Sequence, residues 1–216
     1  MSSFNYIAVE GALASGKTPL ARFLAEKSGA DLLLDDAQGN LFLADFYSNP
    51  ARFAFSAQIF FLVSRYQKLK QLAEPDLFIQ KKVADYIFAR DEIFARLNLN
   101  QREYSLYQSL SQKMETEILS PDLVIYLQAS AVVTQARIKE RKTSYNSNLS
   151  LEYIEKLTQA FDQYFFHYSQ TPLLIVNTNQ LNLFAKEGDL ELIVSEIEKT
   201  NYGTRYFAPA SKDVLL

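Results

Sequence analysis

Short apolar runs alternate along the chain with longer segments in which apolar residues recur every three or four positions. A short apolar run between polar residues is typical of a buried parallel strand. Five segments have this pattern: 6–9, 30–34, 78–84, 123–127 and 173–176. Helical periodicity covers residues 20–25, 51–72, about 86–97, 103–118, 131–141, 151–169 and 189–199. The alternation predicts an α/β fold in which helices cover both faces of a five-stranded parallel sheet.

The same pattern predicts a single domain over residues 1–200, because no internal boundary or repeat interrupts it. A chain of 216 residues is long enough for one α/β domain with a full core. The polar stretch 142–150 lies between two helical segments and predicts a loop. Residues 201–216 lack periodicity and predict a loosely held C-terminal tail.

Between the first strand and the first helix lies the sequence Gly-Ala-Leu-Ala-Ser-Gly-Lys-Thr. It has the G-x-x-x-x-G-K-[ST] spacing of a phosphate-binding loop, in which backbone N–H groups and a helix N-terminus face the phosphates. Lys17 would reach the β- and γ-phosphates, and the Thr18 hydroxyl would bind Mg²⁺. The alternative is a glycine-rich turn that carries Lys-Thr by chance. The residues predicted to bind the nucleotide are Gly11, Ala14, Ser15, Gly16, Lys17 and Thr18.

The amino-acid composition excludes several classes of protein. A net charge of −3 gives no basic excess to bind nucleic acid through its phosphates. The absence of cysteine excludes disulfides and thiolate metal sites, and the single histidine, His167, leaves no histidine-based triad. The apolar stretch 53–63 is too short and too polar to span a bilayer, and a strand near the N-terminus does not fit a signal peptide. These features predict a cytoplasmic protein.

Acidic residues follow the second and third predicted strands. Asp35 and Asp36 come after the second strand, and Asp85 follows the third. Ligands of parallel α/β sheets bind at the carboxyl ends of the strands, where the phosphate loop also lies. Asp35 is therefore placed to accept a proton from an attacking hydroxyl. The alternative is an acidic residue in a turn or a helix cap.

Gln58 and Arg65 are seven residues apart in the long helical segment, so they share one face of the helix. Their neighbours on that face are apolar, and such polar groups need partners or a place at its edge. Glutamine is suited to paired hydrogen bonds with the edge of a nucleobase. A polar pair at the edge of the core is an equally good interpretation.

Arg137 and Arg141 lie on one helical face just before the polar loop. Arginine often binds the oxygens of a phosphoryl group in transfer. A solvated basic face is the commoner explanation of such a pair.

With these features, the chain resembles the deoxynucleoside kinase family from about residue 5 to about residue 180. The resemblance rests on Val9-Glu10-Gly11 with Gly16-Lys17-Thr18, on the segments 46–58 and 91–95, and on the segments 137–141 and 151–157. It implies a P-loop kinase fold with a short lid at about 137–150, and a homodimer. It assigns Asp35 as the catalytic carboxylate and Arg137 and Arg141 as the start of the lid that clamps phosphate. It assigns substrate binding to Tyr47, Gln58, Arg65, Asp85, Asp91 and Phe94.

The chain departs from the family pattern at several positions. Tyr86 stands where the family's acid-Arg-Ser motif has its arginine, and Arg90, one turn further on, is a candidate to replace that cation. Two lid positions carry Thr143 and Asn146 where the family has an arginine and an acid. The catalytic acid is an aspartate, which is one methylene shorter than the usual glutamate.

The leading hypothesis is an enzyme that transfers the γ-phosphate of ATP, with Mg²⁺, to the 5′-hydroxyl of a purine deoxynucleoside. In it Asp35 accepts the proton, and Lys17, Arg90, Arg137 and Arg141 neutralise phosphate charge. A second hypothesis is a catalytically weak nucleotide-binding protein that acts as a sensor. A third is a kinase that acts on a nucleotide or on another small alcohol.

Overall fold

A computed structural model describes residues 4–37, 39–72, 81–141 and 149–209. Its centre is a parallel sheet of six strands in the order β2-β3-β1-β4-β5-β6. The strands are β1 (Tyr6–Gly11), β2 (Asp31–Leu33), β3 (Lys82–Ala84), β4 (Leu123–Gln128), β5 (Leu173–Asn177) and β6 (Thr204–Phe207). The predicted parallel α/β fold is confirmed, with one strand more than expected.

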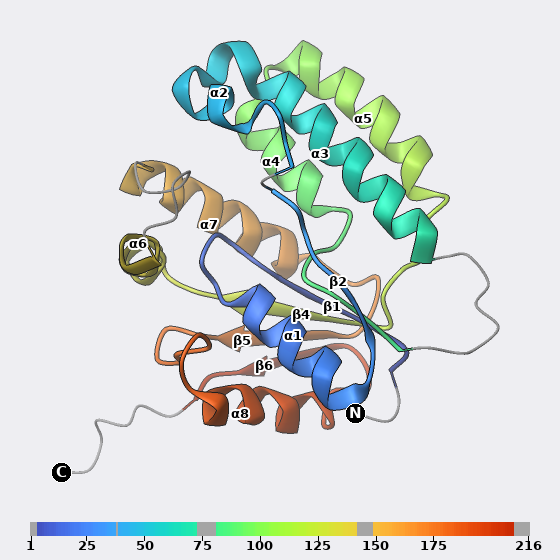
Figure 1. Cartoon of the computed structure of the whole chain (residues 1–216), viewed down its shortest axis with the longest axis vertical. Helices are drawn as coiled ribbons and strands as arrows, with labels where there is room; N and C mark the ends of the chain where they lie inside the picture. The colour runs from blue at the N-terminus through green and yellow to red at the C-terminus, as the bar shows by residue number, and fades with distance from the viewer. Residues whose placement is uncertain (1–3, 38, 73–80, 142–148, 210–216) are drawn as a thin grey trace.

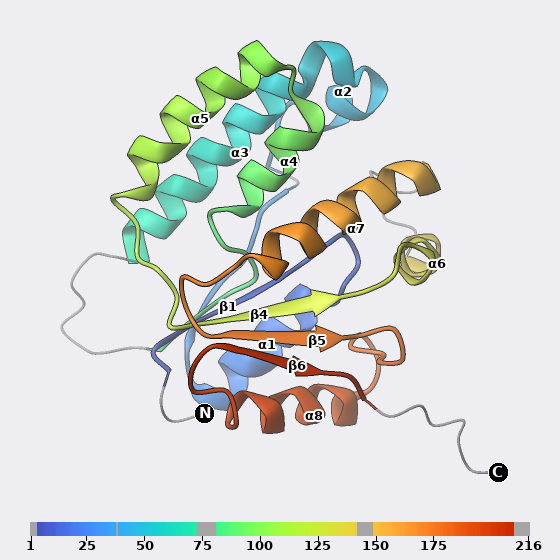
Figure 2. The same ribbon diagram turned by 180° about the vertical axis from the view of Figure 1, so that it is seen from behind.

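Eight helices connect and cover these strands within the described residues. They are α1 (Lys17–Ser28), α2 (Leu43–Ser48), α3 (Pro50–Leu72), α4 (Arg90–Asn98), α5 (Gln101–Glu115), α6 (Ala131–Arg141), α7 (Leu151–Phe166) and α8 (Glu187–Ile197). Helices α1 and α8 lie against one face of the sheet, and α3, α4, α5 and α7 lie on the other side (Figures 1 and 2). None of the helices in the described ranges is long and apolar enough to cross a membrane.

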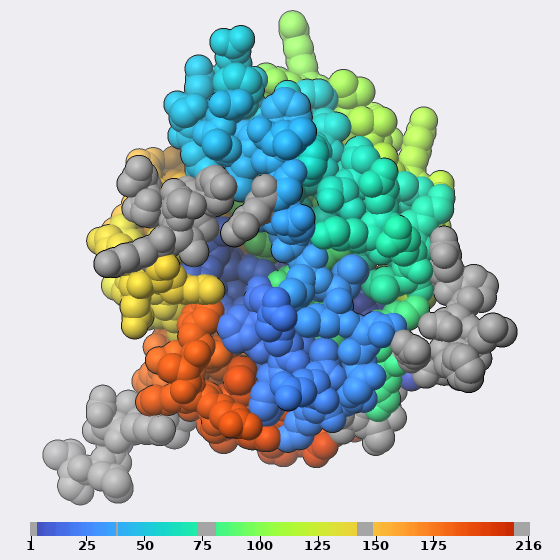
Figure 3. Space-filling view, viewed as in Figure 1, coloured from blue at the N-terminus to red at the C-terminus, as the bar shows by residue number. Residues whose placement is uncertain are grey.

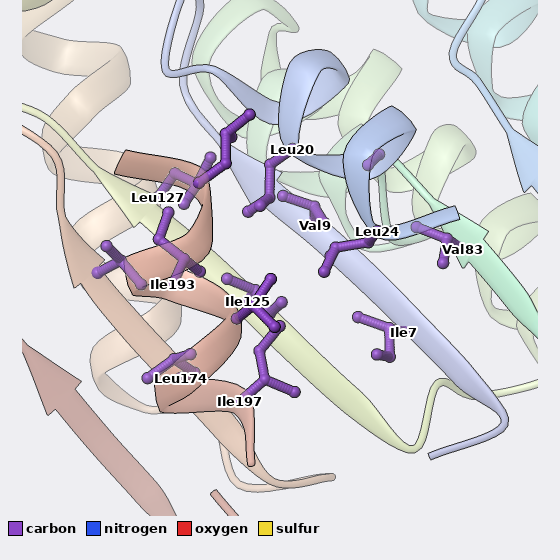
Figure 4. Close-up of a cluster of buried hydrophobic side chains, with 14 of the residues drawn as sticks. Ile7, Val9, Leu20, Leu24, Val83, Ile125, Leu127, Leu174, Ile193 and Ile197 are labelled. Atoms are coloured by element: carbon purple, nitrogen blue, oxygen red, sulfur yellow. The ribbon is translucent and has the colours of Figure 1, made fainter. Parts of the chain in front are cut away.

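Alternate residues of the central strands enter two separate cores. Ile7 and Val9 point to the α1–α8 side, where they meet Leu24, Ile125 and Ile193 (Figure 4). Their neighbours Tyr6 and Ala8 belong to the core under α3, α4, α5 and α7. A strand that is buried on both faces has no polar side, which explains the continuous apolar runs in the sequence.

The sixth strand corrects the prediction of a loosely held tail from residue 201. Thr204–Phe207 pairs with β5 in parallel, at the edge of the sheet. Its residues alternate between exposed and half-buried, so they form no apolar run that would predict a strand. Residues 210–216 lie outside the described residues.

Two further differences concern helices. The short helix α2 was not predicted. Helix α4 begins at Arg90 and not near residue 86, since the buried residues 86–88 are not helical. Within the predicted strand 78–84, residues Lys82–Ala84 form β3 and residue 81 precedes it. Residues 78–80 lie outside the described residues. Of the predicted lid, α6 ends at Arg141, and Thr143 and Asn146 are outside the described residues.

Candidate active site

The loop between β1 and α1 has the backbone that its sequence predicts. Gly16 has a φ of 101°, and a Cβ there would lie 2.7 Å from Leu183 Cδ1. A Cβ on Gly11 would lie 2.6 Å from the carbonyl oxygen of Leu127. Ala14 adopts a left-handed φ of 50°, which is uncommon for residues other than glycine. Gly16 then caps α1, so the N–H groups of the first helical turn face the loop.

Lys17 and Thr18, the first residues of α1, make contacts that fix both side chains. Lys17 Nζ donates to the carbonyl of Ala12 at 3.2 Å, across the loop. Burial, followed by the charge of Arg90, lowers the pKa of Lys17 to about 8. The Thr18 hydroxyl donates to Asp85 Oδ2 at 2.6 Å. Asp85 is buried and does not line the cavity described next, and its assignment to the sugar by sequence resemblance stays a prediction.

A cavity of about 210 Å³ opens beside the loop and is walled by α2, α3, α4 and α7. Leu13 of the loop and Ala37 contribute to its lining. The surface is hollowed between the cyan segment around α2 and the blue segment around α1 (Figure 3). Six residues predicted to act on substrate line the cavity: Asp35, Tyr47, Gln58, Arg65, Arg90 and Phe94. The structure therefore brings together residues that lie as far apart in the sequence as Asp35 and Phe94.

Asp35 lines this cavity and forms a two-pronged ion pair with Arg65. Arg65 Nε donates to Asp35 Oδ1 at 3.0 Å, and Nη2 donates to Oδ2 at 2.7 Å. The Asp35 backbone N–H donates to Asp85 Oδ1 at 2.7 Å, which ties Asp35 to the residue that accepts from Thr18. Burial acts to raise the pKa of Asp35, but Arg65, Arg90 and Lys17 outweigh it and lower that pKa to about 2.

Asp91 lies behind Gln58 and Arg65 and does not line the cavity itself. Its carboxylate is fully buried and accepts hydrogen bonds from Arg65 Nη1 and, at 3.2 Å, from Gln58 Nε2. Gln58 Nε2 also donates to the Asp91 carbonyl at 2.9 Å. Asp91 thus orients the residues that face a ligand. Burial raises the pKa of Asp91 to about 6, although Arg65 opposes the rise.

Arg90 occupies the position between the phosphate loop and Asp35. Its Nη1 donates to Glu10 Oε2 at 2.8 Å and to the Gly11 carbonyl at 3.1 Å, and its Nε lies 3.8 Å from Asp35 Oδ2. The guanidinium also stacks 5.1 Å from the centroid of the Phe94 ring. Tyr86 is buried and lines no part of the cavity. The role of Arg90 as the cation in place of Tyr86 stays a prediction.

Arg137 and Arg141 do not lie in this cavity. Arg137 donates to the carbonyl oxygens of Thr178 and Leu181 at 2.5 and 2.9 Å. The exposed Arg141 lies over the Phe184 ring, 4.3 Å from its centroid. Both hold the segment after β5, whose Leu183 contacts Gly16 from the other side of the phosphate loop. Their role as phosphate clamps stays a prediction.

Three polar residues of the site, Glu10, Asn98 and Tyr153, were not assigned a role from the sequence. Glu10 is fully buried under the phosphate loop, where it accepts from Arg90 and from the backbone N–H groups of Gly11 and Ile87. Asn98 and Tyr153 line the cavity and bond to each other at 3.4 Å. A buried acid at the end of an apolar strand is a usable signal for Glu10, because such a charge needs a buried partner.

Comparison with known proteins identifies the family of this chain. A sequence model of the family described as deoxynucleoside kinase matches residues 7–201. The chain belongs to this family. Among its relatives is the deoxyadenosine kinase of Dictyostelium discoideum, which is 31% identical over 181 residues, or 81% of this chain and 73% of the relative. The deoxyguanosine kinase of Bacillus subtilis (strain 168) is 28% identical over 165 residues, or 75% of this chain and 79% of the relative.

A solved structure supports the same fold for this deoxynucleoside kinase family member. The deoxyadenosine kinase from M. mycoides, solved with the products dCMP and a flexible dCDP, superposes with a TM-score of 0.78. The superposition covers 90% of this chain and 99% of that one, at 24% sequence identity. The P-loop kinase fold predicted from the sequence is thereby confirmed.

Proposed function

We propose that this family member transfers the γ-phosphate of ATP to the 5′-hydroxyl of a purine deoxynucleoside. The observation that carries the proposal is that one cavity is lined by Leu13 of the phosphate loop, by Asp35 and Arg90, and by Gln58 and Phe94. A nucleoside that fills it would place its sugar hydroxyl beside the loop and its base against α3 and Phe94. Phosphoryl transfer depends mainly on positioning and on charge stabilisation, and this arrangement supplies both.

Each residue of the site has a proposed role that follows from its position. Lys17, at the N-terminus of α1, and Arg90, which bonds to the carbonyl of Gly11, neutralise charge on the phosphates. Asp35 accepts the hydroxyl proton. Tyr47 lies in the lining with its hydroxyl kept protonated, since burial raises its pKa, and it is assigned to the sugar.

Magnesium fits the donor set at the loop. Thr18 and Asp85 offer a hydroxyl and a carboxylate oxygen only 2.6 Å apart, and Mg²⁺ usually takes one or two such protein oxygens together with substrate phosphates. Among the described residues no group of three or more His, Cys, Asp or Glu side chains could hold a metal ion, so an all-protein cage is not the alternative. When bound with ATP, Mg²⁺ would neutralise charge on the phosphate oxygens.

The orientation of Gln58 favours adenine among the purines. Two acceptors on Asp91 fix the amide nitrogen, so the network assigns the amide oxygen to the ligand side. An oxygen there accepts from the exocyclic amino group of adenine, whereas guanine offers a carbonyl oxygen at that position. The two relatives described above are named for deoxyadenosine and deoxyguanosine, and others are named for deoxycytidine, all of which are kinases of deoxynucleosides whose base carries an amino group.

Turnover of the four deoxynucleosides with ATP and Mg²⁺ tests the proposal. We expect deoxyadenosine to have the highest kcat/KM, with a preference over thymidine of at least about 100-fold, because an unpaired buried polar group costs roughly 1–3 kcal/mol for each mismatch. Tight ATP binding without phosphorylation of any of the four would contradict the proposal and support a nucleotide sensor. Acceptance of a monophosphate alone would support a nucleotide kinase. The homodimer and the cytoplasmic location stay predictions.

A further inference from the structure

Besides the charged residues around Asp35, the cavity lining includes polar side chains from three other elements. They are Tyr47 of α2, Asn98 of α4 and Tyr153 of α7. Helices α4 and α7 pack against each other, so Asn98 and Tyr153 reach the cavity from neighbouring walls (Figures 1 and 2). The proposed function gives these two residues no role. A polar group in a substrate cavity needs a new partner when the substrate displaces water.

Tyr153 is held in place at its backbone and at its ring. Its backbone N–H donates to Ser150 Oγ at 3.2 Å, in the N-cap that begins α7. Its ring packs against the core that α3, α4, α5 and α7 share. Burial raises the pKa of its hydroxyl, which therefore keeps its proton and can donate it. The side chain thus presents a neutral hydroxyl at a defined position.

Asn98 determines the direction in which this hydroxyl donates. Its Nδ2 donates to the Phe94 carbonyl at 2.9 Å, which assigns the other end of the amide, Oδ1, as an acceptor. The Tyr153 hydroxyl donates to Oδ1 at 3.4 Å. A phenol has one proton and otherwise only lone pairs, so the Tyr153 oxygen can then only accept. It therefore fits a hydrogen-bond donor on the ligand.

The donor groups of deoxyadenosine are its amino group and its two hydroxyls. In the proposed function the 5′-hydroxyl donates to Asp35 and the amino group donates to the amide oxygen of Gln58, which leaves the 3′-hydroxyl. Tyr47, which is assigned to the sugar, lies within electrostatic reach of Tyr153, since Tyr153 contributes to the raised pKa of Tyr47. This places Tyr153 on the side of the cavity that the sugar would occupy.

We propose that Tyr153 accepts a hydrogen bond from the 3′-hydroxyl of the deoxynucleoside, and that Asn98 is a positioning residue that holds the Tyr153 hydroxyl for it. The proposal rests on the proposed function and adds two residues that determine its specificity for the sugar. A nucleoside without a 3′-hydroxyl leaves the Tyr153 oxygen without a partner, so the protein selects against it.

Binding of two nucleosides that differ only in the 3′-hydroxyl tests the contact without catalysis. Isothermal titration calorimetry gives the Kd of deoxyadenosine and of 2′,3′-dideoxyadenosine, and we expect the parent to prefer deoxyadenosine by about tenfold or more. In Tyr153→Phe we expect this preference to fall by about five- to tenfold, because one hydrogen bond is lost. The matched control is Tyr164→Phe, the same change on the same helix, at a residue that lines a different cavity. An unchanged preference in Tyr153→Phe, or an equal fall in the control, would overturn the proposal.

A double-mutant cycle tests whether Asn98 acts through Tyr153. Asn98→Leu removes Oδ1 from a side chain of similar size, and we expect the preference for deoxyadenosine to fall by about threefold as Tyr153 loses its orientation. In the Tyr153→Phe background the same change should have no further effect on the preference. Equal falls in both backgrounds would contradict the positioning role. So would a weaker binding of both nucleosides by the same factor, which is what a purely structural role predicts.

Steady-state kinetics separates this assignment from the proposed function. We expect the ratio of kcat/KM for the two nucleosides to follow the ratio of their Kd values in the parent and in each variant. If the parent binds deoxyadenosine without phosphorylating it, the proposed function fails, and the Kd values still decide the assignment of Tyr153. If Tyr153→Phe changes the preference among bases and leaves the preference for the 3′-hydroxyl unchanged, the assignment to the sugar is wrong. A parent that binds no deoxyadenosine would overturn both proposals.

Discussion

Two aspartates in this site show opposite pKa shifts for reasons that can be traced to individual neighbours. Burial acts to raise the pKa of both, and for Asp91 it prevails, giving a value of about 6. For Asp35 the two-pronged contact of Arg65, with Arg90 and Lys17 nearby, reverses the effect and gives about 2. The sequence shows that one aspartate follows a strand and the other lies in a helix. It cannot show that Arg65 makes two hydrogen bonds to Asp35 and one to Asp91.

Replacement of Asp35 by asparagine tests its place in the reaction. The amide keeps the shape of the side chain but cannot accept the hydroxyl proton. We expect kcat to fall by about 100-fold or more, with the KM for ATP within about twofold of the parent, because general-base catalysis contributes roughly 10²–10⁴-fold. Steady-state assays with deoxyadenosine measure both. A variant with the parent's kcat would show that Asp35 is not the proton acceptor.

A double-mutant cycle on Glu10 and Arg90 measures a buried ion pair. Arg90→Met leaves Glu10 buried without its cation, and we expect a loss of about 3–5 kcal/mol in the free energy of unfolding. Glu10→Gln combined with Arg90→Met removes both charges and should recover part of that loss. Urea unfolding of the four proteins gives the coupling energy. Additive effects, within about 0.5 kcal/mol, would mean that the two charges do not interact.

At the scale of elements, the connection from β1 to α1 is the part that the sequence predicts best. The glycines at both ends of the loop have separate physical reasons: the close approach of the Leu127 carbonyl at Gly11, and both φ and Leu183 at Gly16. The left-handed φ of Gly16 is a local property, and a pattern of eight residues can indicate it. The contacts are made by Leu127 of β4 and by Leu183 after β5, so they depend on the fold.

The two glycines that flank α1, Gly16 and Gly29, allow a matched test of this local geometry. Gly16→Ala meets both a left-handed φ and the side chain of Leu183, so we expect a loss of roughly 2–4 kcal/mol in stability together with the loss of ATP binding. Gly29→Ala, at the other end of the helix, has a similar φ of 63° but open space around it. We expect it to cost about 1 kcal/mol and to leave ATP binding intact. Thermal unfolding and calorimetric ATP titration compare the two, and equal effects would contradict the role of the contact with Leu183.

Elements whose burial depends on distant partners were predicted less well. The short helix α2 carries one buried residue, Leu43, so its sequence has no apolar stripe long enough to be recognised. The start of α4 is set by tertiary packing, since Tyr86, Ile87 and Phe88 are all buried although they precede the helix. In each case the apolar residues face neighbours from other parts of the chain, which a local pattern does not show.

At the scale of the whole molecule, the sheet order accounts for what the sequence predicts of the site. Strands β2, β3 and β1 are neighbours, so the residues that follow them meet at one edge. The sequence therefore places Asp35, Asp85 and the phosphate loop together correctly. It cannot show that Asp85 and Asp91 do not line the cavity, because the lining depends on how α3 and α4 pack above the sheet.

The edge strand β6 offers a prediction about the stability of the whole domain. Phe207 packs against the core on the α1–α8 side, whereas the preceding Tyr206 is 56% exposed. We expect Phe207→Ala to lower the free energy of unfolding by about 1–3 kcal/mol, and Tyr206→Ala by less than about 1 kcal/mol, with kcat unchanged in both. Chemical unfolding and activity assays measure these effects. If the two variants were equally stable, β6 would add no core to the domain.

The position of Arg90 has a consequence for how active members of a protein family are recognised. A survey that checks one position of a sequence alignment at a time would find Tyr86 where the family has an arginine, and would class this chain as inactive. In three dimensions Arg90, four residues further along the chain, lies 3.8 Å from the carboxylate of Asp35, and we propose that it supplies that charge. A search for active enzymes should therefore compare where charges lie in space as well as which residue stands at each position of an alignment.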